Sequence, residues 1–279
     1  MAGIKTDCVG KKLTPAAFSW IWKDIALYNV GIGAYELEHT YENTKGGIRV
    51  IPSFAVVPPF PCLASSLGLT GVNPMMVLHG EQKIIIKKRP LPFKAETITA
   101  GEITDLWDKG KGAVYRILTK TKTKEGEELF DNIFTVFVRG AGGFGGDKGP
   151  EPGNVAPERA PDQTIEDQTM PVQNLIYRLS GDINPLHIDP NFAKMARFEK
   201  PILHGLCSFG FVMRAAIKAC CAGDDAKVKE YEVRFRDVVY PGQKIITKIW
   251  KDGAGRAIIS ANTDDGRNCI ANAAVAYDE

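Results

Sequence analysis

The stretch HGLCSFGFVMRAAIKACC, residues 204–221, decides the fold class. Its apolar positions recur every three or four residues on one face: Leu206, Phe209, Gly210, Met213, Ile217 and Cys220. Such a stripe predicts a long helix with one buried face. Apolar and charged residues then alternate in the segments that follow, which predicts strands over 229–252, 255–263 and 269–277. A helix followed by antiparallel strands indicates the α+β class.

The earlier part of the chain follows a similar plan. Thr14 and Pro15 are typical of a helix start, so we expect a helix over residues 15–28. Residues 77–103 read as strand, turn and strand, and residues 113–140 read as a hairpin with alternating faces. The shared order of helix and antiparallel strands predicts an internal duplication.

A Gly- and Pro-rich segment separates the two halves. Residues 140–171 carry many glycines, prolines and charges and show no periodicity, so we interpret them as a linker. The predicted halves are then residues 1–139 and residues 172–279. The GGFGG sequence at 142–146 matches neither a P-loop nor a dinucleotide fingerprint, and prolines rather than a helix follow it.

Composition and charge exclude several classes of protein. The chain has 279 residues, 44% of them hydrophobic, with 35 Lys and Arg against 33 Asp and Glu and a formal net charge of +2. This charge balance gives no general field for attracting nucleic acid or a membrane surface. No apolar run approaches the roughly 20 residues of a membrane span, and residues 1–12 lack the apolar core of a signal peptide. We therefore expect a soluble protein with no nucleic-acid and no membrane partner.

The cysteines and histidines indicate neither a disulfide framework nor a metal site. The six cysteines include no C-x-x-C pair, and Cys220 and Cys221 are adjacent. The four histidines form no H-E-x-x-H or H-x-H arrangement. We expect reduced thiols, mostly buried, and no bound metal.

The residues best suited to catalysis lie in YRLSGDINPLHIDPNFA, residues 177–193. Asp182, Asn184, Pro185 and His187 fall within six residues, and the Asn-Pro pair disfavours a regular helix. A tight loop can therefore direct the carboxyl and the imidazole to one point, where they can act on water as a general acid and base. The alternative is a surface turn in which Asp182 and Asn184 bind backbone amides.

Two other kinds of site do not fit this stretch. Asp182, Asn184 and Asp189 offer oxygen ligands, but the glycine and glutamate that a calcium loop requires at its sixth and twelfth positions are missing. Ser180 with His187 is not a serine hydrolase pair, because the chain has no G-x-S-x-G elbow there.

Gly205 is a candidate oxyanion-binding residue. It follows His204 at the start of the predicted long helix. The first N–H groups of a helix are unpaired and partly positive, and glycine places no side chain in front of them, so a carbonyl or thioester oxygen could bind there. The alternative is that Gly205 only permits close packing of helix against sheet.

Together these residues resemble a known family. YRLSGDINPLHIDPNFA followed by KPILHGLCSFGF is similar to the signature of 2-enoyl-CoA hydratase 2, the hydratase region of eukaryotic peroxisomal multifunctional enzyme type 2, whose fungal form is the hydratase-dehydrogenase-epimerase. This region is related to the MaoC-like (R)-specific hydratases. The resemblance extends to DIALYNVGIGA, VLHGEQKI, LWDKGKG, GAGGFGG and RFRDVVYPGQ and so covers essentially the whole chain. It implies a double hot dog fold, in which each half is a helix wrapped by a curved antiparallel sheet.

The resemblance also implies roles for individual residues. Asp182 and His187 match the catalytic pair, Asn184 the residue that helps to hold the catalytic water, and Gly205 the oxyanion-binding amide. The acyl-CoA contacts of the family fall here on the following residues: His79, Gly80, Lys109, Asp182, Ile183, Asn184, Pro185, Leu186, His187, Gly205 and Phe235. Lys109 suits a phosphate and Phe235 an apolar or stacking surface.

The reaction implied is reversible hydration of trans-2-enoyl-CoA to (3R)-3-hydroxyacyl-CoA in peroxisomal fatty acid β-oxidation. Asp182 and His187 share one loop, so water and proton should reach the same face of the double bond, which predicts syn addition. We expect His187 to remove the proton from water and Asp182 to deliver one to the α-carbon, although the residues alone allow the reverse. The first half has no such pair, so we expect it to be noncatalytic and to shape the acyl and CoA site.

Two alternatives to the hydratase are kept. A hot dog thioesterase would cleave the same kind of ligand, and a noncatalytic acyl-CoA-binding module would hold it without turnover. No cofactor is expected, because CoA is part of the substrate and the chain has no NAD fingerprint. The resemblance further implies a homodimer, other catalytic domains on a longer parent chain and a peroxisomal location, although these residues include no peroxisomal signal.

Overall fold

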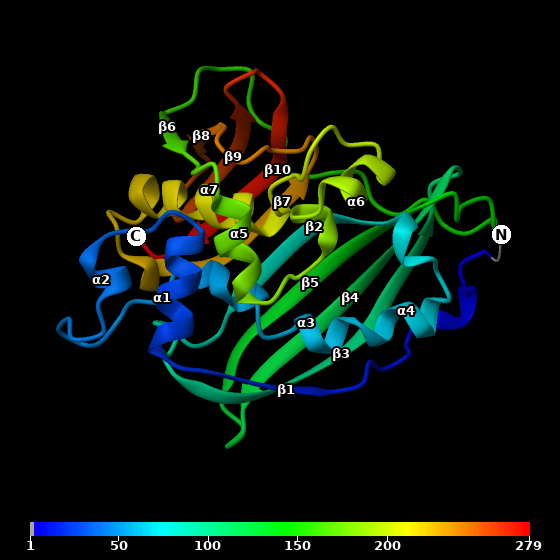
Figure 1. Ribbon diagram of the computed structural model, residues 1–279, viewed down its shortest axis with the longest axis horizontal. Helices are drawn as coiled ribbons and strands as arrows, with labels where there is room; N and C mark the ends of the chain where they lie inside the picture. Colours follow the sequence, from blue (N-terminus) through cyan, green and yellow to red (C-terminus); the bar gives the residue numbers. More distant parts are fainter. Residues whose placement is uncertain (1–2) are drawn as a thin grey trace.

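The computed structural model describes residues 3–279, whose strands form one ten-stranded sheet with antiparallel neighbours throughout (Figure 1). The strands lie in this order across it: β1 (Ala16–Trp20), β3 (Ala95–Asp108), β4 (Gly112–Thr123), β5 (Glu128–Arg139), β2 (Val77–Ile86), β7 (Val228–Phe235), β10 (Asn268–Tyr277), β9 (Arg256–Thr263), β8 (Lys244–Lys251) and β6 (Gln163–Gln168). The α-helices are α1 (Trp22–Gly31), α2 (Leu37–Thr40), α3 (Phe60–Leu63), α4 (Ser65–Thr70), α5 (Gln173–Tyr177), α6 (Pro190–Met195) and α7 (Gly205–Cys220). Short 3-10 turns are η1 (Thr6–Cys8), η2 (Pro52–Val56), η3 (Pro74–Met76), η4 (Arg178–Ser180), η5 (Pro185–His187) and η6 (Asp225–Lys227).

The sheet consists of two units with the same topology. In chain order, the first unit has its strands arranged 1-3-4-5-2, and β6 to β10 repeat that order from the opposite edge of the sheet. The second strand of each unit, β2 and β7, joins the units in antiparallel register from Glu81↔Arg234 to Ile85↔Glu230. The predicted α+β class and double hot dog plan are confirmed, and the shared topology supports the predicted duplication.

The helix α7 lies against the second half of the sheet and supplies much of the larger core. Eleven of its residues are buried, including Phe209 and Met213 on the predicted stripe. A methyl group added at Gly210 would lie 2.4 Å from a side-chain carbon of Ile32, so glycine permits the helix to approach the segment after α1. The Tyr231 hydroxyl on β7 donates to the Phe209 carbonyl oxygen at 3.3 Å. Helix and sheet are thereby fixed to each other by packing and by a buried hydrogen bond.

The first half has no helix of comparable length. Two short helices, α3 and α4, lie over the strands β3 to β5 (Figure 1) and close a smaller core that contains Cys62, Tyr115 and Phe134. Prolines at 58, 59 and 61 confine helix in this segment, and α4 ends at Gly71, whose backbone is left-handed with φ of 68°. The two repeats therefore share a sheet but differ in the helix that it wraps.

The predicted helix start at Thr14 and Pro15 is wrong. The following residues form β1, which pairs with β3 from Ala16↔Thr99 to Trp20↔Ala95, and the helix begins only at Trp22. The Asp24 carboxylate accepts the Ile21 N–H at 2.9 Å and marks the true start. The pairing of this segment with the distant strand β3 is a tertiary effect, and it outweighs the local capping pattern.

The segment 140–171 is not a bare linker. It contains β6, which pairs with β8 and corresponds to β1 in the first half, so the second unit begins before the predicted boundary at residue 172. The preceding part has no helix or strand but is held in place by hydrogen bonds. For example, the Asp108 carboxylate accepts the N–H groups of Gly143 and Gly145 at 2.9 and 2.8 Å. An edge strand of six mostly exposed residues has little apolar periodicity, which is why the sequence did not indicate it.

The cysteines agree with the expectation of reduced, mostly buried thiols. All six cysteines are free thiols, and all except the half-buried Cys220 are buried. Within residues 3–279, none of the helices combines the length and the apolar character needed to cross a membrane.

Candidate active site

A cleft of about 1010 Å³ lies at the junction of the two halves. It is lined by β2 from the first half and by β7, the loop before α6 and the start of α7 from the second half. Six of the predicted residues that line it come from the second half: Asp182, Asn184, Leu186, His187, Gly205 and Phe235. The joining of β2 to β7 therefore forms one site from segments far apart in the sequence.

Two successive Asx turns shape the loop of residues 182–187, which carries the predicted catalytic pair. The Asn184 N–H donates to Asp182 Oδ1 at 3.2 Å, and the Leu186 N–H donates to Asn184 Oδ1 at 3.0 Å. These bonds are the backbone contacts that the surface-turn interpretation predicts. Each bond uses only the Oδ1 atom of the side chain. Asp182 Oδ2 and Asn184 Nδ2 therefore have no hydrogen-bond partner among residues 3–279. The local turn thus shapes the loop and leaves polar atoms to face the cleft.

His187 is buried and held from both sides. Its Nδ1 lies 2.9 Å from the Ile202 carbonyl oxygen, and its own carbonyl oxygen accepts the Asn174 side-chain amide at 2.6 Å. Because a carbonyl oxygen only accepts, Nδ1 carries the proton and the neutral ring presents the Nε2 lone pair. Burial lowers the pKa of His187, opposed by the nearby Asp182 carboxylate. Near neutral pH the ring is therefore a base.

Gly205 begins α7 and lines the same cleft. Its N–H has no hydrogen-bond partner among the described residues, as expected for the first residue of a helix. A methyl group added there would lie 3.3 Å from the ring of Phe235, tighter than ordinary van der Waals contact. Both readings of the sequence apply: glycine permits the close approach of Phe235, and it leaves an exposed donor at a helix N-terminus.

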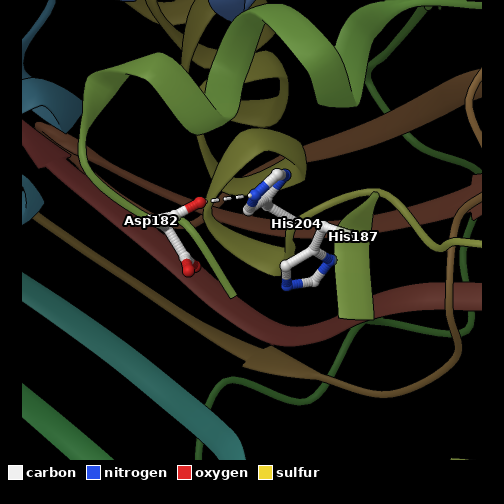
Figure 2. A group of neighbouring side chains, drawn as sticks. All are labelled: Asp182, His187 and His204. Carbon is white, nitrogen blue, oxygen red and sulfur yellow. Dashed lines mark hydrogen bonds between the residues drawn. The ribbon is translucent and has the colours of Figure 1, made fainter. Parts of the chain in front are cut away.

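His204 lies beside the predicted pair, although the predicted site did not include it (Figure 2). Its ring stacks on His187 with 3.8 Å between centroids, and its Nε2 lies 3.1 Å from the Asp182 carbonyl oxygen. Burial and the neighbouring His187 lower the pKa of His204 to about 3, so its ring is neutral. The sequence did carry a signal for His204, because it directly precedes Gly205 at the start of the predicted helix. A histidine buried at that position needs a hydrogen-bond partner nearby.

The same three side chains include donor types that bind metals. One ligand atom each from Asp182, His187 and His204 lies within 4.8 Å of the others. However, Nδ1 of His187 and Nε2 of His204 each already face a backbone carbonyl oxygen. The prediction that the chain uses no metal stays a prediction.

The first half contributes His79, Gly80 and Lys109 to the cleft wall. The pairing of β2 with β5 shifts register between His79 and Glu81, so Gly80 is the extra residue of a β-bulge. The His79 ring meets the ring of Phe235 edge-on with 5.0 Å between centroids. Burial lowers the pKa of His79 to about 4, so this ring is neutral as well.

Two predicted substrate contacts do not line the cleft. Ile183 is 69% exposed, and Pro185 at the start of η5 is also exposed. Their neighbours Asp182, Asn184, Leu186 and His187 do line it. Substrate contact at Ile183 and Pro185 stays a prediction.

A second cavity of about 300 Å³ lies beneath the short helices of the first half. Its walls are almost entirely apolar: Phe60, Leu63, Ala64, Ser66, Leu67, Val77, His79, Tyr115, Ile117, Phe134 and Val136. His79 and Val77 line both this cavity and the main cleft, so the two spaces share a wall.

Comparison with known families and structures defines the class of protein. A model described as "MFE-2 hydratase 2 N-terminal domain" matches residues 18–140, and one described as "MaoC like domain" matches residues 153–267. A solved MaoC-like dehydratase from Phytophthora capsici is 34% identical, with a TM-score of 0.89 and 98% of each chain covered. A Mycobacterium tuberculosis protein with a double hotdog fold, 11% identical and with a TM-score of 0.60, shares the fold alone. The fold and site therefore define a MaoC-like protein.

Curated relatives give the particular family. A probable enoyl-CoA hydratase 2 from Dictyostelium discoideum is 37% identical over 97% of this chain and 95% of its own length. A peroxisomal enoyl-CoA hydratase 2 from Arabidopsis thaliana is 42% identical over 87% of this chain and 85% of its own. The chain spans only 29% of the peroxisomal hydratase-dehydrogenase-epimerase of Neurospora crassa, to which it is 39% identical. The chain belongs to the enoyl-CoA hydratase 2 family.

Proposed function

We propose that this protein catalyses the reversible hydration of trans-2-enoyl-CoA to (3R)-3-hydroxyacyl-CoA. The observation that carries the proposal is that Asp182, His187 and Gly205 all line one cleft, and that the Gly205 N–H has no hydrogen-bond partner among residues 3–279. The reaction needs a base for water, an acid for the α-carbon and a donor for the thioester oxygen, and these residues supply one of each.

In the hydration direction, the water oxygen attacks C3 while Nε2 of neutral His187 accepts a proton from it. The electron pair of the double bond moves toward C2, and negative charge grows on the thioester oxygen, where the Gly205 N–H donates. Asp182 starts this step protonated and gives its proton to C2. The proton that His187 took from water then passes to the Asp182 carboxylate, so both groups regain their starting state and the net change is the addition of one water. The bound Nδ1 of His187 supports this direction because it leaves Nε2 as the acceptor. One ring nitrogen of His187 and one carboxylate oxygen of Asp182 lie within 4.8 Å of each other, so one water can reach both side chains.

We assign the CoA portion to the main cleft and the acyl tail to the apolar cavity. Lys109, at the turn between β3 and β4, lines the cleft and suits a phosphate group. The cavity beneath α3 and α4 has little polar surface and suits the methylene groups of a long acyl chain. His79 lines both the main cleft and this cavity, and its ring contacts Phe235, which lines the cleft.

Replacing Leu67 with Trp should shorten the acyl chains that the enzyme accepts. Leu67 lines the apolar cavity, and the larger side chain fills space that a ten-carbon chain requires. We expect kcat/KM for trans-2-decenoyl-CoA to fall at least about tenfold, since each buried methylene contributes about 0.8 kcal/mol. The value for trans-2-butenoyl-CoA should change less than about threefold.

The matched control is Leu69→Trp. Leu69 belongs to the same helix and is also half-buried, but it does not line the cavity. Its variant should keep the chain-length profile of the wild type. An equal loss of activity for both substrates in Leu67→Trp would show that the cavity does not hold the acyl tail.

The activity itself is tested with trans-2-decenoyl-CoA. Loss of the enoyl absorbance near neutral pH, with product consumed by a (3R)-specific and not by a (3S)-specific dehydrogenase, is the expected result. Release of free CoA thiol would instead indicate the thioesterase. Binding of the substrate without either change would indicate the noncatalytic acyl-CoA-binding module. The reaction itself requires no added cofactor.

We propose a peroxisomal location on the basis of two relatives that are named peroxisomal. Some relatives are multifunctional enzymes much longer than this chain and others are of similar length, so other catalytic domains on a longer parent remain a prediction. A microscopy experiment with the natural full-length product tests the location.

We also retain the prediction of a homodimer. Exposed apolar side chains on three mutually contacting elements, α1, α5 and η4, support it: Trp22 is 39%, Leu175 43% and Leu179 59% exposed. Sedimentation velocity at micromolar concentration should give the mass of two chains. A single-chain mass at every concentration would contradict the prediction.

A further inference from the structure

His204 contacts or adjoins all three residues of the proposed mechanism: His187, Asp182 and Gly205. Its side chain has no exposed surface, and its ring lies flat against the ring of His187 at 28° between planes. On one edge, Nε2 faces the backbone carbonyl oxygen of Asp182 (Figure 2). Along the chain, it is the residue directly before Gly205, and its own carbonyl oxygen accepts the first intrahelical bond of α7.

The partners of His204 fix its protonation. The Asp182 carbonyl oxygen can only accept, so Nε2 must carry a proton and donate it. The other ring nitrogen, Nδ1, is buried without a partner among the described residues and therefore holds a lone pair. A second proton on this ring would add an unpartnered buried charge directly against His187, which is costly. The His204 ring therefore stays neutral while the stacked His187 ring gains and loses a proton.

The catalytic loop needs such an anchor. Gly181 and Ile183, on either side of Asp182, are exposed, and the carboxylate itself makes only a local turn contact with Asn184. The bond from His204 joins the backbone of Asp182 to the start of α7, a long buried helix. Without that bond, the acid is held only by its own turn, and the distance to His187 is free to vary.

We propose that His204 is a positioning residue, which holds the Asp182 backbone by its Nε2–H and the His187 ring by stacking, so that acid and base keep one separation. This inference rests on the proposed function, because the reaction requires both groups at the same double bond. Substrate binding does not depend on that separation. Loss of His204 therefore lowers kcat and leaves KM nearly unchanged.

Three substitutions separate the two contacts. His204→Gln keeps an amide N–H near the position of Nε2 but loses the stacked ring. His204→Phe keeps a ring over His187 but loses the donor. His204→Leu loses both. We expect kcat for trans-2-decenoyl-CoA hydration to fall about tenfold in each of the first two and about a hundredfold in the third, with KM within about threefold of wild type.

Cys207→Ala is the matched control for lost packing. Cys207 is fully buried on the same helix and contacts Gly31 rather than Asp182 or His187. It should lower the melting temperature without lowering kcat. If His204→Leu fails to fold, the Gln and Phe variants decide the question by themselves.

The outcomes separate this inference from the proposed function. An inactive wild type would overturn the proposed function. An active wild type with His204 variants within threefold of its kcat would overturn the positioning role. A fall in kcat that follows the melting temperature alike in all three variants and in Cys207→Ala would assign His204 to the core alone. We expect kcat of His204→Gln and of His204→Phe to lie between those of the wild type and His204→Leu, with KM unchanged.

Discussion

Replacing Asp182 with Asn or His187 with Ala lowers the turnover number by at least about a hundredfold and leaves the protein folded. Asn keeps the shape of the side chain and can still contact the Asn184 N–H, but it cannot deliver a proton. Ala at position 187 removes the Nε2 lone pair that we assign as the base for water. The measurement is the rate of enoyl absorbance loss with saturating trans-2-decenoyl-CoA, together with a melting curve for each variant.

Asn191→Ala serves as the control for this experiment. Asn191 is an exposed residue of α6 in the same region of the chain and does not line the cleft, so its variant should retain wild-type turnover. A catalytic-pair variant with near-normal turnover would remove that residue from the mechanism. If His187→Ala loses both turnover and the folded state, Asp182→Asn becomes the deciding variant, because it keeps the volume of the side chain.

Replacing Gly205 with Pro should have the second largest effect, because proline removes the single N–H that we assign to the thioester oxygen. Position 205 is the first residue of α7, where proline is tolerated, and His204 has φ of −59° and ψ of 134°, which suit a residue before proline. Helix formation should therefore survive. Removal of one oxyanion donor lowers turnover by about a hundredfold to a thousandfold in other enzymes, and we expect a loss of that order here.

Gly205→Ala is the matched control. Alanine places the same methyl group 3.3 Å from the Phe235 ring but keeps the N–H. The difference in kcat between the Pro and Ala variants therefore isolates the donor from the steric effect. Equal activity of the two variants would show that another group binds the thioester oxygen.

Much of the fold followed from local sequence patterns. The long helix that became α7 and the hairpin of β4 and β5 combine strong periodicity with clear turns, and both were predicted correctly. The site loop was also predictable, because Asp182, Asn184 and His187 are close in the chain and their turn is formed by their own side chains. Local interactions of this kind do not depend on the rest of the fold.

The errors have one physical cause. The strand β1 was read as helix and β6 as linker, and both are edge strands whose only partners, β3 and β8, lie far away in the sequence. A short edge strand has one paired side and little buried surface, so its pattern is weak.

The sequence by itself determined the fold class, the long buried helix, and the acid, amide and imidazole of one short loop. Local propensity and side-chain chemistry act over a few residues and can be read directly. Tertiary structure alone decided which segments meet: β2 with β7 at the cleft, His79 with Phe235 beside the apolar cavity, and His204 against His187. These contacts join residues distant in the chain or on separate elements, and the packing of two curved half-sheets fixes them.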